Sequence, residues 1–107
     1  MNKYADSTGR WYDVFWSVSH HGQYVPDRPW CLILRSKPGT PGEPYDGIRY
    51  MKSYATREEA IRECAKERAF RSKTYQRIKV KLQAEFERQV GLAVLELERD
   101  APTGPPA

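Results

Sequence analysis

The residues that could carry out chemistry are few, and we consider metal ligands first. The only soft ligands in the chain are His20, His21, Cys31 and Cys64. Adjacent histidines on a turn rarely point at one ion, and no pair of these residues has the spacing of a zinc site. We therefore expect two exposed loop histidines, two free thiols in a reducing compartment, and neither a metal nor another cofactor.

A hydrolytic triad is the next chemistry to consider. Asp13, Ser17, Ser19 and His20 lie close together in the sequence. Residues along one strand and its turn do not converge on a substrate without a framework that brings other elements to them. The glycines of segment 36–44 sit among prolines and do not open a helix, so they do not form a phosphate-binding loop. The sequence therefore predicts a protein without catalytic activity.

The distribution of basic residues is more informative than the net charge of +4. Segment 57–82 holds nine basic and four acidic residues, whereas segment 83–107 holds two basic and five acidic residues. Such a concentration of positive charge could neutralise phosphates, or it could be an ordinary solvated helix surface. The basic stretch is opposed only by Glu67 and comprises Lys66, Arg68, Arg71, Lys73, Arg77, Lys79 and Lys81.

The first half of the chain predicts a three-stranded antiparallel sheet, with strands over 11–19, 30–35 and 45–54. In the first strand, Tyr12, Val14, Trp16 and Val18 alternate onto one face, which we expect to contact the helices. Trp11 and Phe15 then lie on the opposite face. Basic side chains at or near strand positions could contact nucleic-acid bases from such a sheet; they are Arg10, Arg35, Arg49 and Lys52.

The second half of the chain predicts helix from residue 57 to about residue 99. Thr56 and Glu59 have the spacing of a capping box, which marks the start of the helix. The periodic pattern fits either one long helix or two helices broken near 71–74, and the usual length of helices favours the break. Phe70 points away from the apolar stripe. The fold class is α+β, with a single domain over 1–100 and a disordered tail over 101–107.

Residues 47–61 resemble the strand-to-helix junction of small three-stranded DNA-binding domains, such as the arm-type domain of tyrosine integrases. There the last strand carries basic residues, an aromatic residue precedes a threonine cap, and a Glu-Ala pair opens the helix, as in Tyr54, Thr56 and Glu59-Ala60 of this chain. The resemblance implies a sheet that lies in the major groove of DNA. By position, Arg49 and Lys52 match its contact residues.

These observations lead to the hypothesis of a small, non-catalytic nucleic-acid-binding module. Its predicted contact residues are Arg35, Arg49, Lys52, Arg71, Lys73, Arg77 and Lys79. The alternative is a small protein-binding adaptor or inhibitor that uses Trp11, Phe15, Trp30 and the proline-rich loop 36–44. The C-terminal part of the helix is apolar on more than one side, so it could pack against the sheet of its own chain or form a homodimer with a second copy. No apolar run is long enough to cross a membrane, and we expect a cytoplasmic protein.

Overall fold

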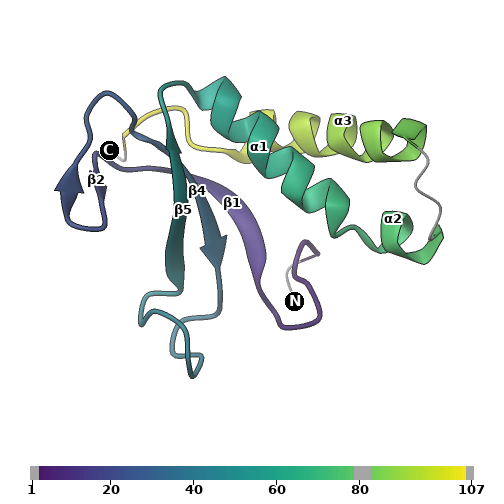
Figure 1. Cartoon of the computed structure of the whole chain (residues 1–107), viewed down its shortest axis with the longest axis horizontal. Helices are drawn as coiled ribbons and strands as arrows, with labels where there is room; N and C mark the ends of the chain where they lie inside the picture. The colour runs from purple at the N-terminus through teal and green to yellow at the C-terminus, as the bar shows by residue number, and fades with distance from the viewer. Residues whose placement is uncertain (1–2, 79–82, 106–107) are drawn as a thin grey trace.

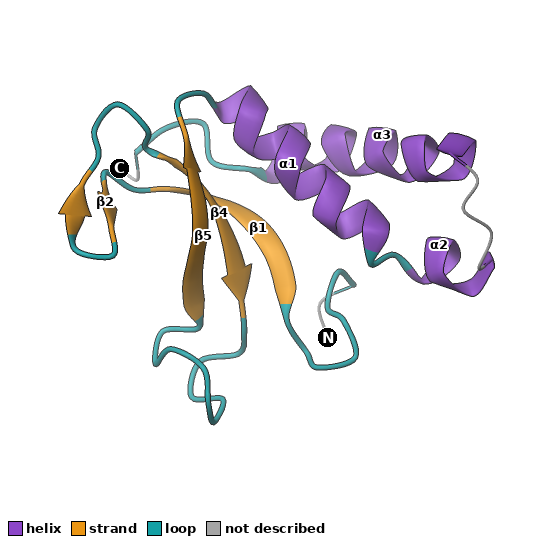
Figure 2. Cartoon of the chain, in the orientation of Figure 1, coloured by secondary structure: helices purple, strands orange, loops and turns teal. Residues whose placement is uncertain are grey.

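The computed structural model describes residues 3–78 and 83–105, and its fold is α+β, as the sequence predicts. A three-stranded antiparallel sheet precedes the helices, which lie against one side of it (Figures 1 and 2). The elements follow in the order β1 (Trp11–Trp16), β2 (Ser19–His20), β3 (Gln23–Tyr24), β4 (Trp30–Arg35), β5 (Ile48–Tyr54), α1 (Arg57–Phe70), α2 (Lys73–Ile78) and α3 (Gln83–Asp100).

The sheet has the strand order β1-β4-β5, with β4 in the centre. Leu32 of β4 pairs with Val14 of β1 on one side and with Lys52 of β5 on the other. The apolar run of β4 is explained by burial on both faces, since Leu32 belongs to the core on the helix side while Cys31 and Ile33 are buried on the other side. The predicted first strand is too long: β1 ends at Trp16, and the following residues form the small β2–β3 hairpin.

The helical half is broken near residues 71–74, as the sequence analysis predicts. Thr56 caps α1, because its Oγ1 accepts a hydrogen bond from the backbone N–H of Glu59 at 3.2 Å. Phe70 ends α1, and Ser72 opens α2 by accepting a hydrogen bond from the N–H of Tyr75 at 3.1 Å. A further helix, α3, follows from Gln83, so the helical half contains three helices in its described part.

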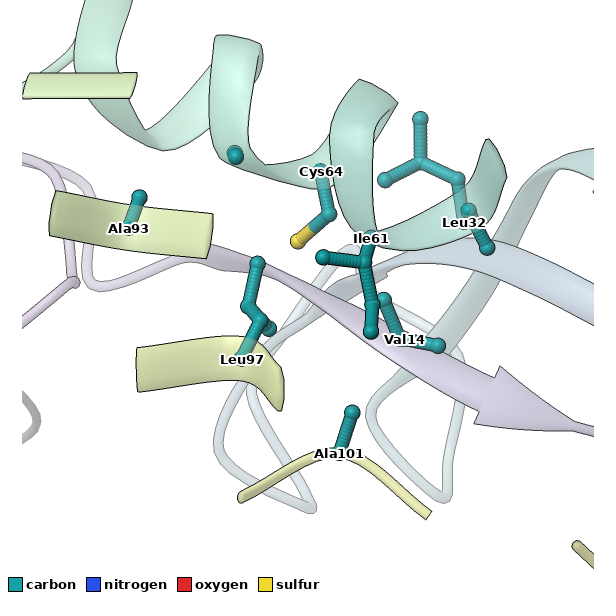
Figure 3. Close-up of a cluster of buried hydrophobic side chains, with 9 residues drawn as sticks. Val14, Leu32, Ile61, Cys64, Ala93, Leu97 and Ala101 are labelled. Carbon is teal, nitrogen blue, oxygen red and sulfur yellow. The ribbon is translucent and has the colours of Figure 1, made fainter. Parts of the chain in front are cut away.

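The main core lies between the sheet and the pair α1 and α3. Figure 3 shows Ile61 and Cys64 of α1 directed toward Leu97 of α3 and toward Val14 of β1. Alternation along the strand places Tyr12 on the same face as Val14, as the sequence predicts. Burial raises the pKa of the Cys64 thiol to about 12, so this thiol stays protonated and acts as a small apolar side chain.

One arginine joins the start of α1 to the end of α3. The guanidinium of Arg57 donates hydrogen bonds to the backbone carbonyls of Glu98, Ala101 and Pro102 at 2.9, 3.1 and 2.7 Å. The carbonyl of Glu98 belongs to the last turn of α3 and has no partner within the helix, and the other two carbonyls directly follow the helix. The predicted tail 101–107 thus begins with residues that are held in place, and Ala101 is buried in the core.

The opposite face of the sheet is partly covered by the β2–β3 hairpin, which lies on the other side from the helices in Figure 1. Cys31 and Ile33 are buried on this face.

The turn of the β2–β3 hairpin uses positive φ at His21 (52°) and Gly22 (78°), the backbone that a two-residue turn requires. His20 anchors the hairpin, because its Nδ1 lies 2.6 Å from the Oγ of Ser53 in a hydrogen bond. The expectation of two exposed loop histidines is therefore wrong for His20, which is half-buried.

This anchor makes stability depend on pH. Burial, followed by the nearby charges of His21 and Arg28, lowers the pKa of His20 from its ordinary value of 6.5. The unfolded chain therefore binds more protons than the folded chain just below pH 6.5, and stability falls as the pH decreases through this window. We expect the melting temperature to fall between pH 7.5 and pH 5.5, and the fall to be smaller in His20→Gln. An equal fall in both proteins contradicts this role of His20.

Candidate nucleic-acid interface

The two arginines among the predicted contact residues of the sheet are engaged in ion pairs. Arg35 Nε lies 2.8 Å from Asp13 Oδ2, and Arg49 Nη2 lies 2.8 Å from Glu43 Oε2. Glu43 also contacts Arg10, at 3.3 Å, so that the proline-rich loop is joined both to β5 and to the residue that precedes β1. These arginines hold the sheet and its loop together, which leaves less of their charge for a ligand.

Most of the remaining predicted contact residues lie away from the sheet, at the junction of α1 and α2. Lys52 is exposed on β5, with its Nζ 5.5 Å from the ring centre of Tyr54. Lys79 lies outside the described residues. Arg71, Lys73 and Arg77 lie near one another at the junction of α1 and α2, so this is the place where the structure gathers the predicted basic residues.

The N-terminal segment 3–7 packs against this junction, and Arg68 holds it there. The guanidinium of Arg68 lies 3.9 Å from the ring centre of Tyr4, and its Nε donates a 2.9 Å hydrogen bond to the carbonyl of Tyr12. Its Nη2 also lies 3.3 Å from Asp13 Oδ1. The side chain of Arg68 is only 8% exposed, so it positions the segment and does not itself face solvent.

A cleft lies between the N-terminal segment and the α1–α2 junction. Its wider part has a volume of about 640 Å³ and is lined by Ala5, Asp6, Ser7, Arg71, Lys73 and Gln76. A narrower part of about 230 Å³ shares Ala5, Arg71 and Lys73 and continues toward Lys3, Tyr4, Arg68, Ser72 and Glu96. Arg71 and Lys73 therefore stand where the two parts meet. We refer to both parts together as the basic cleft.

The acidic residues of the basic cleft are satisfied within the protein. Asp6 Oδ1 accepts hydrogen bonds from the backbone of Thr8 and Arg10 and from the hydroxyl of Thr8. Burial alone would raise the pKa of Asp6, but these hydrogen bonds lower it below its ordinary value, so the group is a carboxylate. Glu96 lies 3.0 Å from Lys3 Nζ.

Arg71 and Lys73, which line the basic cleft, and Arg77, which follows on α2 outside its lining, differ in how firmly they are held. Arg71 pairs with Glu67, and its guanidinium lies over the ring of Tyr12, 4.7 Å from the ring centre. Lys73 and Arg77 are exposed and form no ion pair within the described part of the chain. The arrangement combines one pre-oriented planar cation with two cations whose charge is available, which suits a phosphate-bearing ligand.

The roles of Arg68 and Phe70 in this site are not predicted from the sequence, although both residues leave a signal in it. Arg68 belongs to the basic stretch of the sequence, yet it contributes by packing and not by contacting solvent. Phe70 lies off the apolar stripe beside Arg71, and its side chain is 53% exposed. The signal in the sequence is a large aromatic residue that lies outside the apolar core pattern and next to an arginine. Such a residue is expected to be exposed on the surface.

The residues of the protein-binding alternative are divided between the two faces of the sheet. Phe15 lies on the face away from the helices, where its ring contacts Tyr50 at 6.2 Å between centres. Trp11 shares that face by alternation. Trp30 instead packs against the core on the helix side. No single surface therefore contains all three residues. On α3, Leu92 and Leu95 are exposed, and the homodimer through this helix stays a prediction.

The remaining chemical candidates stay apart in the structure. Asp13 pairs with Arg35 and Arg68, while His20 bonds Ser53 and neither of the serines near it in sequence. Within residues 3–78 and 83–105, no three histidine, cysteine or acidic side chains lie together as metal ligands would.

Across the same ranges, every helix is too short or too polar to cross a bilayer. Comparisons with protein-family models, with curated proteins and with solved structures find no match to this chain.

Proposed function

We propose that this protein is a non-catalytic nucleic-acid-binding module that holds phosphates in the basic cleft. The observation that carries the proposal is that Arg71 and Lys73 line one cleft, with Arg77 in the last turn of the short helix α2. Lys73 and Arg77 carry charge that no described acidic group neutralises. Nonspecific binding to nucleic acid depends mainly on such cations, because each phosphate contact releases condensed counterions.

The proposal moves the contact surface from the sheet to the α1–α2 junction. Arg49 and Lys52, which the integrase resemblance implies as contact residues, lie on β5, and Arg49 is paired with Glu43. A sheet that entered the major groove would present its free face, yet the hairpin covers part of that face. The basic cleft is open and has an excess of cations, so we favour it as the site of phosphate contact.

The experiment measures fluorescence anisotropy of labelled random-sequence DNA and RNA over a series of salt concentrations. Three phosphate contacts predict a slope of log K against log salt of about −2 to −3. The double variant Lys73→Gln/Arg77→Gln should reduce the magnitude of this slope by roughly 1.5 and weaken binding to all sequences. Both side chains are exposed, so the variant should keep its fold.

The matched control removes the same charge from the sheet. Arg49→Gln/Lys52→Gln should leave affinity and slope close to those of the wild type, because neither residue lines the basic cleft. The variant should also keep its fold, because Glu43 keeps its contact with Arg10. A loss of binding in this control but not in the cleft variant would place the interface on the sheet and contradict the proposal. Absence of binding at low salt would also refute it, and a search for a protein partner would follow.

A further inference from the structure

A series of aromatic contacts, which includes the guanidinium of Arg71, lies next to the basic cleft. The guanidinium of Arg71 contacts two rings, at 4.7 Å from the centre of Tyr12 and 5.7 Å from the centre of Phe70. Phe70 in turn contacts Tyr75, with ring centres 6.2 Å apart, and Tyr75 contacts Phe86 at 5.5 Å. The rings come from β1, α1, α2 and α3, so tertiary structure and not sequence spacing builds the series.

Phe70 stands out in this series by its exposure. It is the residue that ends α1, and 53% of its surface is exposed to solvent. A hollow of about 410 Å³ beside it is lined by Lys66, Glu67, Phe70, Arg71 and Phe86. The hollow shares Arg71 with the basic cleft. A ligand whose phosphates lie in the cleft can therefore bring its next group to the ring of Phe70.

The chemistry of this juxtaposition distinguishes single strands from duplexes. Bases of a single strand expose their faces and can stack on an aromatic ring, whatever their sequence. Bases of a duplex stack on one another, so between its two ends a duplex offers its phosphates to the basic cleft but no base face to Phe70. Arginine beside the ring adds a planar cation on which a base can also stack.

We infer that the ligand of the basic cleft is single-stranded nucleic acid, with a base stacked on Phe70. This inference rests on the proposed function and adds the ligand class to it. The cations determine that the protein binds a polyanion, and Phe70 determines that the polyanion is unpaired.

The test compares three labelled probes of equal length: a 12-nucleotide oligo-dT, a 12-base-pair duplex and a 12-unit abasic strand that keeps the phosphates without bases. We expect the wild-type protein to bind oligo-dT about tenfold more tightly than the abasic strand or the duplex. Phe70→Ala should remove this preference and leave the affinity for the abasic strand unchanged.

Two further variants separate stacking from a packing role of Phe70. Phe70→Leu keeps the apolar contact with Tyr75 but has no ring, and it should lose the preference for oligo-dT. Phe70→Trp should keep the preference. Equal wild-type affinity for all three probes, or an unchanged preference in Phe70→Leu, overturns this inference and leaves the proposed function standing. Failure to bind any of the probes refutes the proposed function itself.

Discussion

Replacement of Gly47 by alanine is expected to lower the free energy of unfolding by about 3 kcal/mol. Gly47 has a φ of +75°, and a Cβ at this position would lie 2.1 Å from the backbone oxygen of Ser36. The two residues are also joined by a hydrogen bond from the N–H of Ser36 to the carbonyl of Gly47 at 2.8 Å. Since a backbone atom causes the clash, the loop between β4 and β5 must open to relieve it. Urea unfolding followed by tryptophan fluorescence measures the change.

The control for this prediction is Gly39→Ala in the same loop. Gly39 has a φ of +84°, but a Cβ there would meet no atom within 4 Å. Alanine at Gly39 therefore costs only the left-handed backbone, about 1 kcal/mol. If the two variants lose the same free energy of unfolding, the cost at Gly47 comes from its backbone conformation alone. The close approach of Ser36 then makes no contribution, which contradicts this prediction.

The second large effect is expected for Leu97→Ala, which should lower the free energy of unfolding by about 3 kcal/mol. Leu97 is 1% exposed and lies where α3 meets Ile61 and Cys64 of α1 (Figure 3). Truncation removes apolar contacts from both helices and leaves a cavity that these helices can close only in part. Urea unfolding at a fixed protein concentration measures the loss.

Leu95→Ala is the matched control, because it makes the same chemical change two residues away. Leu95 is 67% exposed, so its truncation should change the free energy of unfolding by no more than about 0.5 kcal/mol. A loss at Leu95 that equals the loss at Leu97 would show that α3 packs against α1 through a different face from the one described.

Local patterns account for the elements that the sequence predicts well. Alternation in β1 identifies its helix-facing side, and the apolar run of β4 identifies a strand covered on both faces. Thr56 marks the start of α1 because a cap depends on residues only three positions apart. The β2–β3 hairpin is missed because its strands of two residues are too short to produce a period.

The arrangement of the charges could not be predicted in the same way. Glu43 and Arg10 are 33 residues apart, and Arg68 reaches Tyr12 across 56 residues. Such contacts depend on the tertiary fold, so the sequence identifies Arg49 as basic but not as paired. The sequence likewise places Arg71 and Lys73 in a basic stretch, and only the position of the N-terminal segment turns that stretch into one wall of a cleft.

The most direct test of the central claim locates the bound nucleic acid. Amide chemical shifts of the isotope-labelled protein would be followed during titration with the 12-nucleotide oligo-dT at low salt. We predict that the largest changes fall on residues 3–7 and 66–77, which surround the basic cleft and Phe70. Changes concentrated on β1 and β5, or no changes at all, would contradict the account.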